Sequence, residues 1–439
     1  MGFGWGKSWC HEGYFLHICC KQTSGVLEID VLIVGAGISG LSSALHLERA
    51  GKRVLMLEAS DRPGGRIKTD EVDGYRLDHG FQVLLTEYPE AKEQLNYNDL
   101  DLQAFRPGAM VLHAKGKSLV ADPFREPTKL FSSLFAPVGT LQDKLKLLRL
   151  RRDLKEVPVD HLFRMPELKT WEYLRSKDFS ESMLYKFFLP FMRGIYLEKD
   201  LNTSSRMFDF VFKMFSEGNT TVPSLGMEEI PKQLVNALVR TEIKVKTKVM
   251  AVEGSTVRTT HGELLSAKKV LVACEPNEFV NPFNPVAPDD MHSTVNLYFT
   301  ADKSPESKPY LILNGSREGV VNNVVVMSQV SDAYAPRGSH LISVSLLGQF
   351  ESDDETLAHH VKSELKTWYG EEVEKWQLLK TYRIDKALPK LNTVRDQAPS
   401  ASFKMNDHLF ATGDYMLNGS IHGALKAGRL AAEAILEDF

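Results

Sequence analysis

Three glycines that fall close together in the sequence point to phosphate binding. They are Gly35, Gly37 and Gly40, in the stretch DVLIVGAGISG of residues 30–40. The first glycine permits a tight turn, the second lets the backbone approach a pyrophosphate, and the third lets a helix lie against a strand. The stretch therefore predicts a site at which phosphates meet backbone N–H groups.

The elements that would position these glycines are a strand and a helix. Residues 31–34 form an apolar run typical of a buried parallel strand, and residues 38–50 carry apolar side chains at helical spacing. A second strand, residues 53–57, ends in Glu58, whose carboxylate can accept hydrogen bonds from both hydroxyls of a ribose. This unit predicts a bound dinucleotide with an unphosphorylated 2′-hydroxyl, and both NAD and FAD satisfy it.

The residues after this unit favour FAD. The stretch ASDRPGGRIKT contains Gly64 and Gly65, which again leave space beside the backbone, and Arg66, whose guanidinium is a forked donor to phosphate. A second loop that faces phosphates suits FAD, because this cofactor would lie extended across the domain. The stretch GYRLDHGFQVL, residues 74–84, then alternates like a strand and breaks at Gly80, as expected where a strand end passes close to a flat ring.

Taken together, these motifs resemble those of the FAD-dependent amine oxidase superfamily, which includes monoamine and polyamine oxidases, protoporphyrinogen oxidase and phytoene desaturases. The resemblance extends to VPSLGMEEIPKQL, residues 222–234, and to LFATGDYMLNGSIHGALKAGRLAAEAIL, residues 409–436. The sequence between these motifs is not distinctive. The resemblance implies a flavoprotein fold with FAD as the cofactor.

Carried over position by position, the family pattern assigns a set of residues to the cofactor. Glu58 would bind the adenosine ribose, Val249 would meet the adenine through its backbone, and Asp414 would contact the pyrophosphate or the ribityl chain. The full set is Gly35, Gly37, Ile38, Ser39, Gly40, Glu58, Gly64, Gly65, Arg66, Gly80, Phe81, Val249, Gly413, Asp414 and Ile421.

Two further features of the sequence bear on how FAD is held. Ser60 stands where relatives often carry a basic residue beside the ribose, which weakens one contact. No cysteine lies in the C-terminal motif, so the covalent flavin link of monoamine oxidases is not expected. The resemblance therefore implies noncovalent FAD.

The predicted fold class is α/β, with a discontinuous Rossmann-like FAD-binding domain and a second α+β substrate domain. A helical cap and an antiparallel sheet would form the substrate domain, as a pocket over the flavin ring requires. The FAD-binding domain is predicted at residues 29–90, 222–285 and 395–439. The substrate domain is predicted at residues 91–221 and 286–394, and residues 1–28 are expected to be a flexible extension.

Composition and charge exclude several classes of function. The formal net charge of -4, from 53 Lys and Arg against 57 Asp and Glu, gives no basic footprint for nucleic acid. No apolar run approaches the roughly 20 residues that span a bilayer. The four cysteines form no spaced disulfide framework, which indicates a reducing compartment, and we expect the cytoplasm. Cys10, His11, His17, Cys19 and Cys20 match no standard zinc spacing, and no metal is predicted.

A basic amphipathic stretch, residues 140–157, invites a membrane interpretation. Leu141, Leu145 and Leu148 recur at helical spacing beside lysines and arginines, so the stretch could rest on an anionic membrane surface. The favoured alternative is a surface helix whose leucines face the core, because acidic residues dilute its charge. Peripheral membrane contact stays open.

Aromatic and methionine side chains are concentrated in two other stretches. These stretches are residues 184–197 and 207–215, which contain LYKFFLPFMRGIYL and MFDFVFKMF. Soft apolar walls of this kind suit an apolar substrate, and core packing explains the same pattern equally well.

No residue can be assigned a catalytic role from the sequence. Flavin chemistry takes a hydride from a substrate C–H, and a helix starting at Ser420 to His422 would favour the negative charge that develops on the ring. His422, Tyr415 and His79 are weak candidates for proton transfer because each stands close to a cofactor motif. A histidine beside a cofactor is more often a polar packing residue.

The sequence favours an FAD-dependent oxidoreductase whose substrate is a largely apolar small molecule. The expected reaction is dehydrogenation of this substrate or its flavin-assisted isomerisation. The expected reaction is like that of desaturases and protoporphyrinogen oxidase, and oxygen or a quinone would reoxidise the flavin. An amine oxidase that releases peroxide is the alternative, and a non-catalytic lipid carrier on the same fold is another. An NAD-linked dehydrogenase would leave the second glycine loop and the C-terminal motif without a ligand. Substrate identity and oligomeric state stay open.

Overall fold

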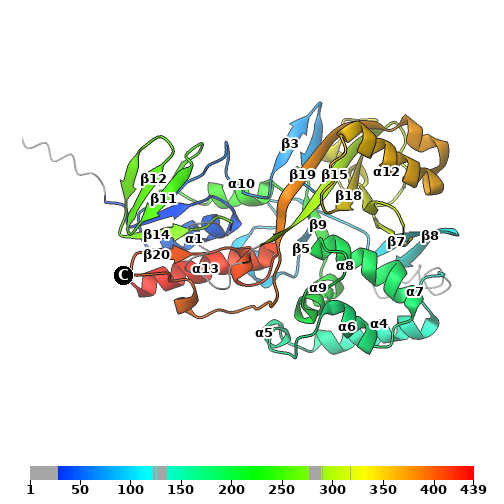
Figure 1. Ribbon diagram of the computed structural model, residues 1–439, viewed down its shortest axis with the longest axis horizontal. Coiled ribbons are helices and arrows are strands. Elements are labelled where there is room, and N and C mark those ends of the chain that lie inside the picture. Colours follow the sequence, from blue (N-terminus) through cyan, green and yellow to red (C-terminus); the bar gives the residue numbers. More distant parts are fainter. Residues whose placement is uncertain (1–27, 122–124, 126–135, 276–287, 289, 317) are drawn as a thin grey trace, which may run out of the picture.

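The computed structural model describes residues 28–121, 125, 136–275, 288, 290–316 and 318–439. The predicted extension, residues 1–28, lies outside the described residues except for Glu28, and so do the cysteines and histidines within it. The described chain folds into two lobes joined by the long strands β15 and β19 (Figure 1). Within these residues, no helix combines the length and the apolar character that crossing a membrane requires.

The first lobe is built on a parallel sheet that draws its strands from three distant parts of the chain. In spatial order the strands are β10 (Glu242–Lys244), β2 (Val54–Leu57), β1 (Val31–Val34), β14 (Lys269–Val272) and β20 (Leu409–Ala411). All four residues of β1 are buried, as the apolar run predicts. The sheet confirms the Rossmann-like, discontinuous α/β architecture.

Helices pack on this sheet. Figure 1 shows α1 (Ile38–Arg49) and α13 (Ile421–Glu437) side by side. They pack closely because Ser42 Oγ donates to the Leu425 carbonyl at 2.7 Å, and a Cβ on Gly428 would lie 2.3 Å from the Ser39 carbonyl oxygen. Also in this lobe are α2 (Pro89–Gln94), α10 (Glu229–Asn236), and the antiparallel strands β11 (Val249–Glu253), β12 (Thr256–Thr259) and β13 (Leu264–Ser266).

The second lobe contains a mixed sheet. Its strands in spatial order are β19 (Gln377–Pro389), β15 (Met291–Ala301), β18 (His340–Leu347), β17 (Val321–Val326), β16 (Leu311–Asn314), β7 (Gly108–His113) and β8 (Gly116–Ala121). Most neighbours are antiparallel, as predicted, but β16 and β7 pair in parallel. The strands β7 and β8 come from the segment expected to be helical, so the cap segment also contributes to the sheet. One face of the sheet packs against α12 (Asp354–Tyr369).

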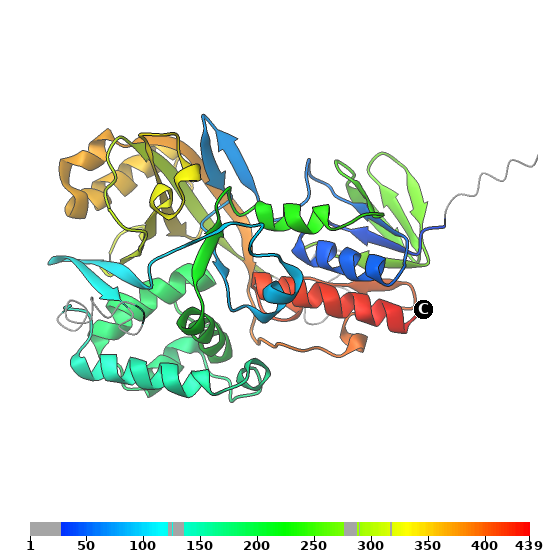
Figure 2. The same ribbon diagram turned by 180° about the vertical axis from the view of Figure 1, so that it is seen from behind.

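Helices of the cap lie below this sheet in Figure 1 and are seen from behind in Figure 2. They are α4 (Leu141–Lys155), α5 (Val159–Leu162), α6 (Thr170–Ser176), α7 (Glu181–Met183), the π-helical turn η2 (Leu184–Phe188), α8 (Leu189–Tyr196) and α9 (Ser205–Glu217). The predicted aromatic stretches are η2, α8 and α9. Phe188, Phe208 and Phe210 are fully buried and stack on other aromatic rings, so these side chains form the core of the cap.

The basic stretch forms α4, but its leucines do not all face the core. Leu150 and Leu154 are buried, whereas Leu141 and Leu145 are 57% and 59% exposed. The N-terminus explains the orientation, because Thr140 and Asp143 cap the helix reciprocally and Asp143 also accepts hydrogen bonds from Ser180. This anchor directs the first turn's leucines outward, which corrects the expectation that the leucines pack on the core.

Short strands connect the two lobes. They are β3 (Thr69–Val72) with β4 (Tyr75–Asp78), and β5 (Leu84–Leu85) with β9 (Thr220–Pro223) and β6 (Leu102–Ala104). Asp78, at the end of β4, accepts a hydrogen bond from Tyr334 Oη at 2.8 Å, and its carbonyl accepts one from Tyr298 Oη of β15 at 3.0 Å. The strand before Gly80 is therefore tied to the sheet of the second lobe. The remaining short elements are α11 (Met327–Val330), η3 (Asp332–Tyr334), η4 (Gly370–Lys375), η5 (Ser400–Ser402) and η6 (Asp414–Met416).

Candidate active site

The three glycines in the turn between β1 and α1 have different surroundings. Gly35 has φ +102°, and a Cβ there would lie 2.8 Å from the Ala273 carbonyl oxygen. A Cβ on Gly40 would lie 2.3 Å from the Gly35 carbonyl oxygen, so this glycine is needed for packing. At Gly37 the nearest atom to an added Cβ is 3.9 Å away. Of the three positions, Gly37 alone has room for an added Cβ, and this room would let a phosphate group approach the backbone.

The second glycine loop lies directly against the first. Gly64 N donates to the Ala36 carbonyl at 2.9 Å, and Gly65, with φ +61°, lies so close that a Cβ on it would be 3.1 Å from Gly37 Cα. The N-terminus of α1 has no side-chain cap. Backbone N–H groups at the start of α1 are therefore available beside the second loop, which fits the pyrophosphate of FAD.

Glu58 ends β2 and holds the turn. Its Oε2 accepts from Ala36 N at 2.8 Å, and its Oε1 accepts from Ser60 N at 2.9 Å. Thr247 N donates to the Glu58 carbonyl at 2.8 Å, which brings the start of β11, and with it Val249, beside the acid. The predicted ribose and adenine contacts are thus neighbours in the fold.

A basic side chain stands beside Ser60 although the sequence places none at that position. Lys68 Nζ donates to Ser60 Oγ at 3.1 Å, and Ser60 Oγ donates to Glu58 Oε1 at 2.7 Å. Lys68 is only 13% exposed. Sequence reasoning missed this residue because the basic group comes from eight positions further along the chain.

Arg66 of the second glycine loop and Asp414 of the C-terminal motif form an ion pair. Arg66 Nη2 lies 2.7 Å from Asp414 Oδ1, and Arg66 Nη1 donates to the Ala387 carbonyl at 3.0 Å. Thr412, just before Gly413 and Asp414, is fully buried, and its Oγ1 has no hydrogen-bond partner among the described residues. A buried hydroxyl of this kind is usually satisfied by a ligand or a water. The C-terminal motif therefore has donors and acceptors to offer to the cofactor.

His422 is placed inside the protein. Its Nε2 is 3.0 Å from Asp396 Oδ1, its Nδ1 accepts from Glu90 N at 3.3 Å, and its ring packs between Tyr88 and Phe210. Both ring nitrogens of His422 are thus engaged and the ring is 1% exposed, and its role in proton transfer stays a prediction.

Asp396 organises the start of α13, although no pattern in the sequence points to this residue. It is buried and binds Lys426 as well as His422, while Ser420 caps the helix by accepting from Gly423 N at 3.0 Å. Burial opposes ionisation, but the hydrogen bonds from His422 and Lys426 outweigh it and lower the pKa of Asp396. The helix terminus, including the half-buried Ile421, is thereby held in one position.

Tyr415 and His79 are also engaged. Tyr415 Oη donates to the Thr412 carbonyl at 3.3 Å, and its ring lies over Gly413, where a Cβ would be 2.1 Å from a ring carbon. His79 Nε2 lies 3.1 Å from Asp70 Oδ2, and its ring is 4.7 Å from that of Tyr382. The His79 side chain is 32% exposed and lies beside Gly80.

The strand break at Gly80 is also a close approach. Gly80 has φ +85°, and a Cβ there would lie 2.8 Å from Ile384 Cδ1 of β19. Phe81 is half-buried and contacts Phe105 edge to face, with ring centroids 6.1 Å apart. The close approach seen at Gly80 is to β19 of the second lobe, and the approach of a flat ring stays a prediction.

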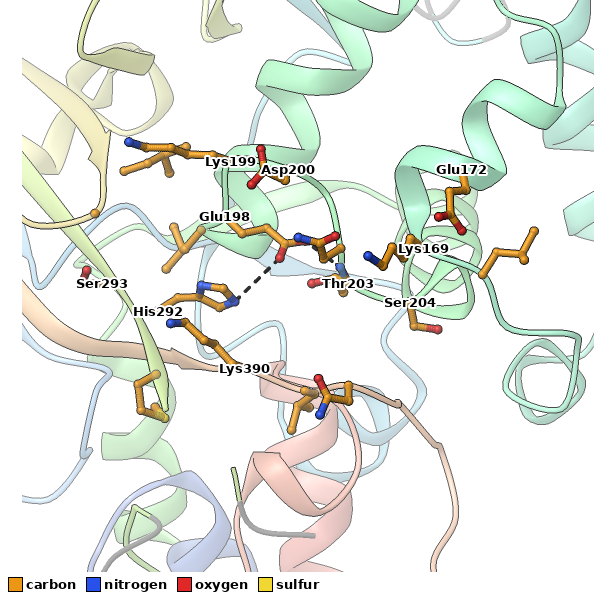
Figure 3. A pocket seen from close by; sticks show the side chains of 18 of the residues that line it. Lys169, Glu172, Glu198, Lys199, Asp200, Thr203, Ser204, His292, Ser293 and Lys390 are labelled. Carbon is orange, nitrogen blue, oxygen red and sulfur yellow. Dashed lines mark hydrogen bonds and ion pairs between the residues drawn. The ribbon is translucent and has the colours of Figure 1, made fainter. Parts of the chain in front are cut away.

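A cavity of about 940 Å³ lies between the cap and the sheet of the second lobe (Figure 3). Its walls come from the loop before α6, the segment after α8, the start of β15, the end of β18 and the segment after β19. The lining residues are Glu167, Leu168, Lys169, Glu172, Leu197, Glu198, Lys199, Asp200, Asn202, Thr203, Ser204, Met291, His292, Ser293, Leu347, Gly348, Lys390, Leu391 and Asn392.

The cavity adjoins the C-terminal motif. At the end of β19, Leu388 and Pro389 contact Gly419: a Cβ on this glycine would lie 3.0 Å from Leu388 Cδ1. The chain then lines the cavity at Lys390, which Figure 3 shows between His292 and the translucent red helix α13. Arg395 N donates to the Leu417 carbonyl at 2.9 Å, which ties the same segment to the motif. The end of β19 and the residues that follow it therefore link the cavity to the loop before α13.

Inside the cavity, a carboxylate faces an imidazole. His292 Nε2 and Glu198 Oε2 are 4.0 Å apart, with side chains 13% and 11% exposed (Figure 3). Burial raises the pKa of Glu198, and the nearby Asp200 adds to this effect. Burial, together with the charge of Lys390, lowers the pKa of His292 to about 4, so the imidazole is neutral at neutral pH.

The cavity wall is polar where the sequence predicted an apolar one. Of the two aromatic stretches, only Leu197 reaches the lining. Glu198 and His292 come from distant segments of the chain, and no motif marks either of them. Across the described residues, no three His, Cys, Asp or Glu side chains gather as a metal site.

Comparison with known proteins identifies relatives. The family model described as flavin-containing amine oxidoreductase matches residues 38–436. The flavin-containing amine oxidase B of Cavia porcellus is 26% identical over 279 residues, which is 57% of this chain and 51% of that protein. The phytoene dehydrogenase of Streptomyces griseus is 52% identical over 54 residues, 12% of this chain and 11% of that protein. The chain thus matches about half, or less, of these curated relatives.

The fold has close structural counterparts. A protein from Exiguobacterium sp. 255-15, provisionally named a protoporphyrinogen oxidase, superposes with a TM-score of 0.69 at 19% sequence identity. The superposition covers 93% of this chain and 99% of that protein. This similarity establishes the shared two-lobed architecture.

Proposed function

The chain belongs to the family of flavin-containing amine oxidoreductases, and from this premise we propose that it is an oxidoreductase that dehydrogenates a small molecule bound in the cavity under the cap. Its cofactor is FAD, as the sequence predicts. The observation that carries the proposal is the end of β19 and the residues after it, which contact Gly419 just before α13 and then line the cavity. Bound FAD supplies the hydride acceptor.

Residues of the first lobe would hold the cofactor. The open space at Gly37, backed by Gly65, fits the pyrophosphate, and Glu58 fits the adenosine ribose. Arg66 and Asp414 would bind between the two halves of the cofactor, where Thr412 Oγ1 has no other partner. The positive end of the α13 dipole would favour negative charge on a reduced ring.

The second lobe would bind and orient the substrate. The polar lining favours a substrate with hydrogen-bonding groups over a wholly hydrocarbon one, because burying these side chains against hydrocarbon would cost their hydration. We propose that oxygen or a quinone reoxidises the flavin.

A largely apolar substrate, of the kind that desaturases and protoporphyrinogen oxidase use, is the second candidate. Leu168, Leu197, Met291, Leu347 and Leu391 provide an aliphatic part of the wall that favours it. Oxidation of an amine with release of peroxide fits the polar part of the same wall. A lipid carrier without flavin receives no support, since such a protein would not need the open space at Gly37.

The test is anaerobic reduction of the flavin. The FAD-loaded protein is mixed with panels of amines, polar alcohols and isoprenoid-like compounds, and loss of the oxidised-flavin absorption is followed. A polar compound should bleach the flavin, and oxygen or a quinone should restore the colour. Fast reduction by a reduced nicotinamide, with none by any organic substrate, would contradict the proposal.

A pair of variants tests whether the cavity is the substrate site. Ser293→Trp places a large ring in the cavity, whereas Lys308→Trp adds the same ring at an exposed position outside it. Ser293→Trp should raise KM for the reducing substrate about tenfold or more, with unchanged FAD content, because it removes room for the ligand. Equal KM values for the two variants would place the substrate elsewhere.

A further inference from the structure

A buried ion pair lies at the start of α13 and takes no part in the proposed chemistry. Its members are Asp396 and Lys426, with Lys426 Nζ 2.5 Å from Asp396 Oδ2. The two side chains are 4% and 9% exposed, respectively. A buried ion pair contributes little net stability compared with apolar side chains of similar size, because both charges lose their hydration. Folding alone therefore does not explain the pair.

The third member of this cluster, His422, is neutral. Its Nδ1 lies 3.3 Å from the backbone nitrogen of Glu90, which can only donate, so Nδ1 is the acceptor and carries no proton. The proton is on Nε2, which donates to Asp396 Oδ1 at 3.0 Å. Because Nδ1 is occupied in this way, His422 cannot gain a second proton to replace a charge lost from the ion pair. The cluster therefore holds one negative and one positive charge.

The ion pair lies close to the helix end at which the proposed function places the flavin ring. Lys426 stands little more than one turn inside α13, and Asp396 is bonded to His422 in the first turn. The first N–H groups of α13 have no partner within the helix and point toward the same end. Charges buried in protein interact over longer distances than exposed ones, because little water screens them. Both members of the pair would therefore act on a ring bound at this end.

We propose that Asp396 and Lys426 set the reduction potential of the bound flavin by balancing each other's charge beside the ring. The proposal rests on the proposed place of FAD and is independent of the substrate. A flavin ring that takes up two electrons and one proton gains one negative charge, so a net positive charge nearby favours reduction and a net negative charge opposes it. In the intact pair these two effects oppose each other, and the N-terminus of α13 supplies the remaining positive potential. Neither residue need touch the ring, so both are positioning residues for the reaction.

The test compares flavin reduction potentials in two variants that unbalance the pair in opposite senses. Each FAD-loaded protein is reduced chemically at pH 7.5 beside a reference dye, without substrate. Asp396→Asn leaves Lys426 unbalanced and should raise the ratio of reduced to oxidised flavin at a fixed potential about tenfold, which is about 30 mV for a two-electron couple. Lys426→Met leaves Asp396 unbalanced and should lower the same ratio about tenfold. A displaced helix has no reason to reverse the sign of the shift between these variants.

Two controls separate the effect of charge from the effect of structure. Combining Asp396→Asn with Lys426→Met makes the cluster neutral again, so the ratio should return to within about twofold of the wild-type value. Asp438→Asn removes a charge of the same sign just beyond the other end of α13, where Asp438 is 25% exposed and pairs with Lys269 and Lys404. The 17 residues of α13 span roughly 25 Å, so this variant should change the ratio less than about twofold.

Shifts of the same sign in the two single variants, or no shift in either, would overturn the proposal. Equal shifts in Asp396→Asn and Asp438→Asn would also overturn it. If one single variant does not retain FAD, the other single variant compared with the double variant still carries the test, because the two differ by one charge. A chain that no substrate reduces would refute the proposed function, but these potentials, measured without substrate, would stand.

Discussion

At the scale of single residues, Gly37 and Gly40 look alike in sequence but have opposite surroundings. An added Cβ meets nothing closer than 3.9 Å at Gly37, and it meets the Gly35 carbonyl oxygen at 2.3 Å at Gly40. We therefore predict that Gly37→Ala leaves the unfolding free energy of the FAD-free protein within about 0.5 kcal/mol and weakens FAD at least tenfold. Gly40→Ala should destabilise the FAD-free protein by about 1–3 kcal/mol, because overpacking forces the turn apart.

Urea denaturation of the FAD-free variants and fluorescence titration with FAD make the comparison. Each variant serves as the other's control, since both add one methyl group to the same turn. Normal FAD affinity in Gly37→Ala would show that its open space does not face the cofactor. Unchanged stability in Gly40→Ala would show that the turn can relax.

The residues that sequence reasoning identified are those with local signals. The spacing of Gly35, Gly37 and Gly40 within one turn predicts their positions, and the structure places close neighbours beside a Cβ at Gly35 and Gly40 and room for one at Gly37; the contact of Gly37 with a pyrophosphate stays a prediction. Glu198 and His292 have no such signal, because only the packing of the cap on β15 brings them together. For the same reason, the engagement of His422 with Asp396 could not be read from either residue alone.

At the scale of elements, β4 depends on the charge state of Asp78. Asp78 is buried, and its carboxylate accepts hydrogen bonds from Thr69, Met227 and Tyr334. Burial raises its pKa to about 6. Because the folded-state pKa lies above the ordinary value, the stability that Asp78 contributes is complete at low pH and is lost as the pH rises through about 6.

Replacing Asp78 by Asn should remove this pH dependence. The unfolding free energy of Asp78→Asn minus that of the wild type should increase by about 1 kcal/mol between pH 5 and pH 7. The reason is that only the wild type loses stability by ionising the buried acid. Urea denaturation at both pH values measures it. Asp407→Asn, at a position 91% exposed, is the control and should show no such trend. A constant difference between Asp78→Asn and wild type would contradict the assigned pKa.

The elements themselves were easier to predict than their orientation. The helix α4 and the strands β15 to β18 stand where their periodicity predicts them. Which leucines of α4 face the core depends on the bond between Asp143 and Ser180, a tertiary contact. Likewise, the aromatic residues of α8 and α9 pack on each other, and their composition could not distinguish a core from a substrate wall.

At the scale of the whole molecule, the structure bears on how FAD is retained. Cys274, the one cysteine among the described residues, follows β14 beside the glycine turn, where its N is 3.4 Å from an added Cβ on Gly35. We predict that acid precipitation releases all of the FAD into the supernatant, as expected for noncovalent binding. Cys274→Ser should release the same amount. Flavin that stays with the precipitated protein, and is found on a peptide by mass spectrometry, would contradict this prediction.

The two-lobed plan was accessible from the sequence because each segment of the first lobe carries its own motif. The five strands of the parallel sheet come from the segments that these motifs mark. The domain boundaries stay predictions, and the one at residues 285 and 286 lies outside the described residues. The contribution of β7 and β8 to the second sheet was missed, since pairing with β16 joins segments that share no motif.

The packing of α1 on α13 also sets an order of events during synthesis. Ser42 and Leu425, which are hydrogen-bonded, are 383 residues apart in sequence. At roughly 5–20 residues per second, α1 would leave the ribosome about 20–80 s before its partner helix. The apolar face of α1 stays uncovered during that interval, and the nascent chain has no complete place for FAD. Cofactor loading is therefore a late step, and chaperones that shield apolar helices have the whole interval in which to act.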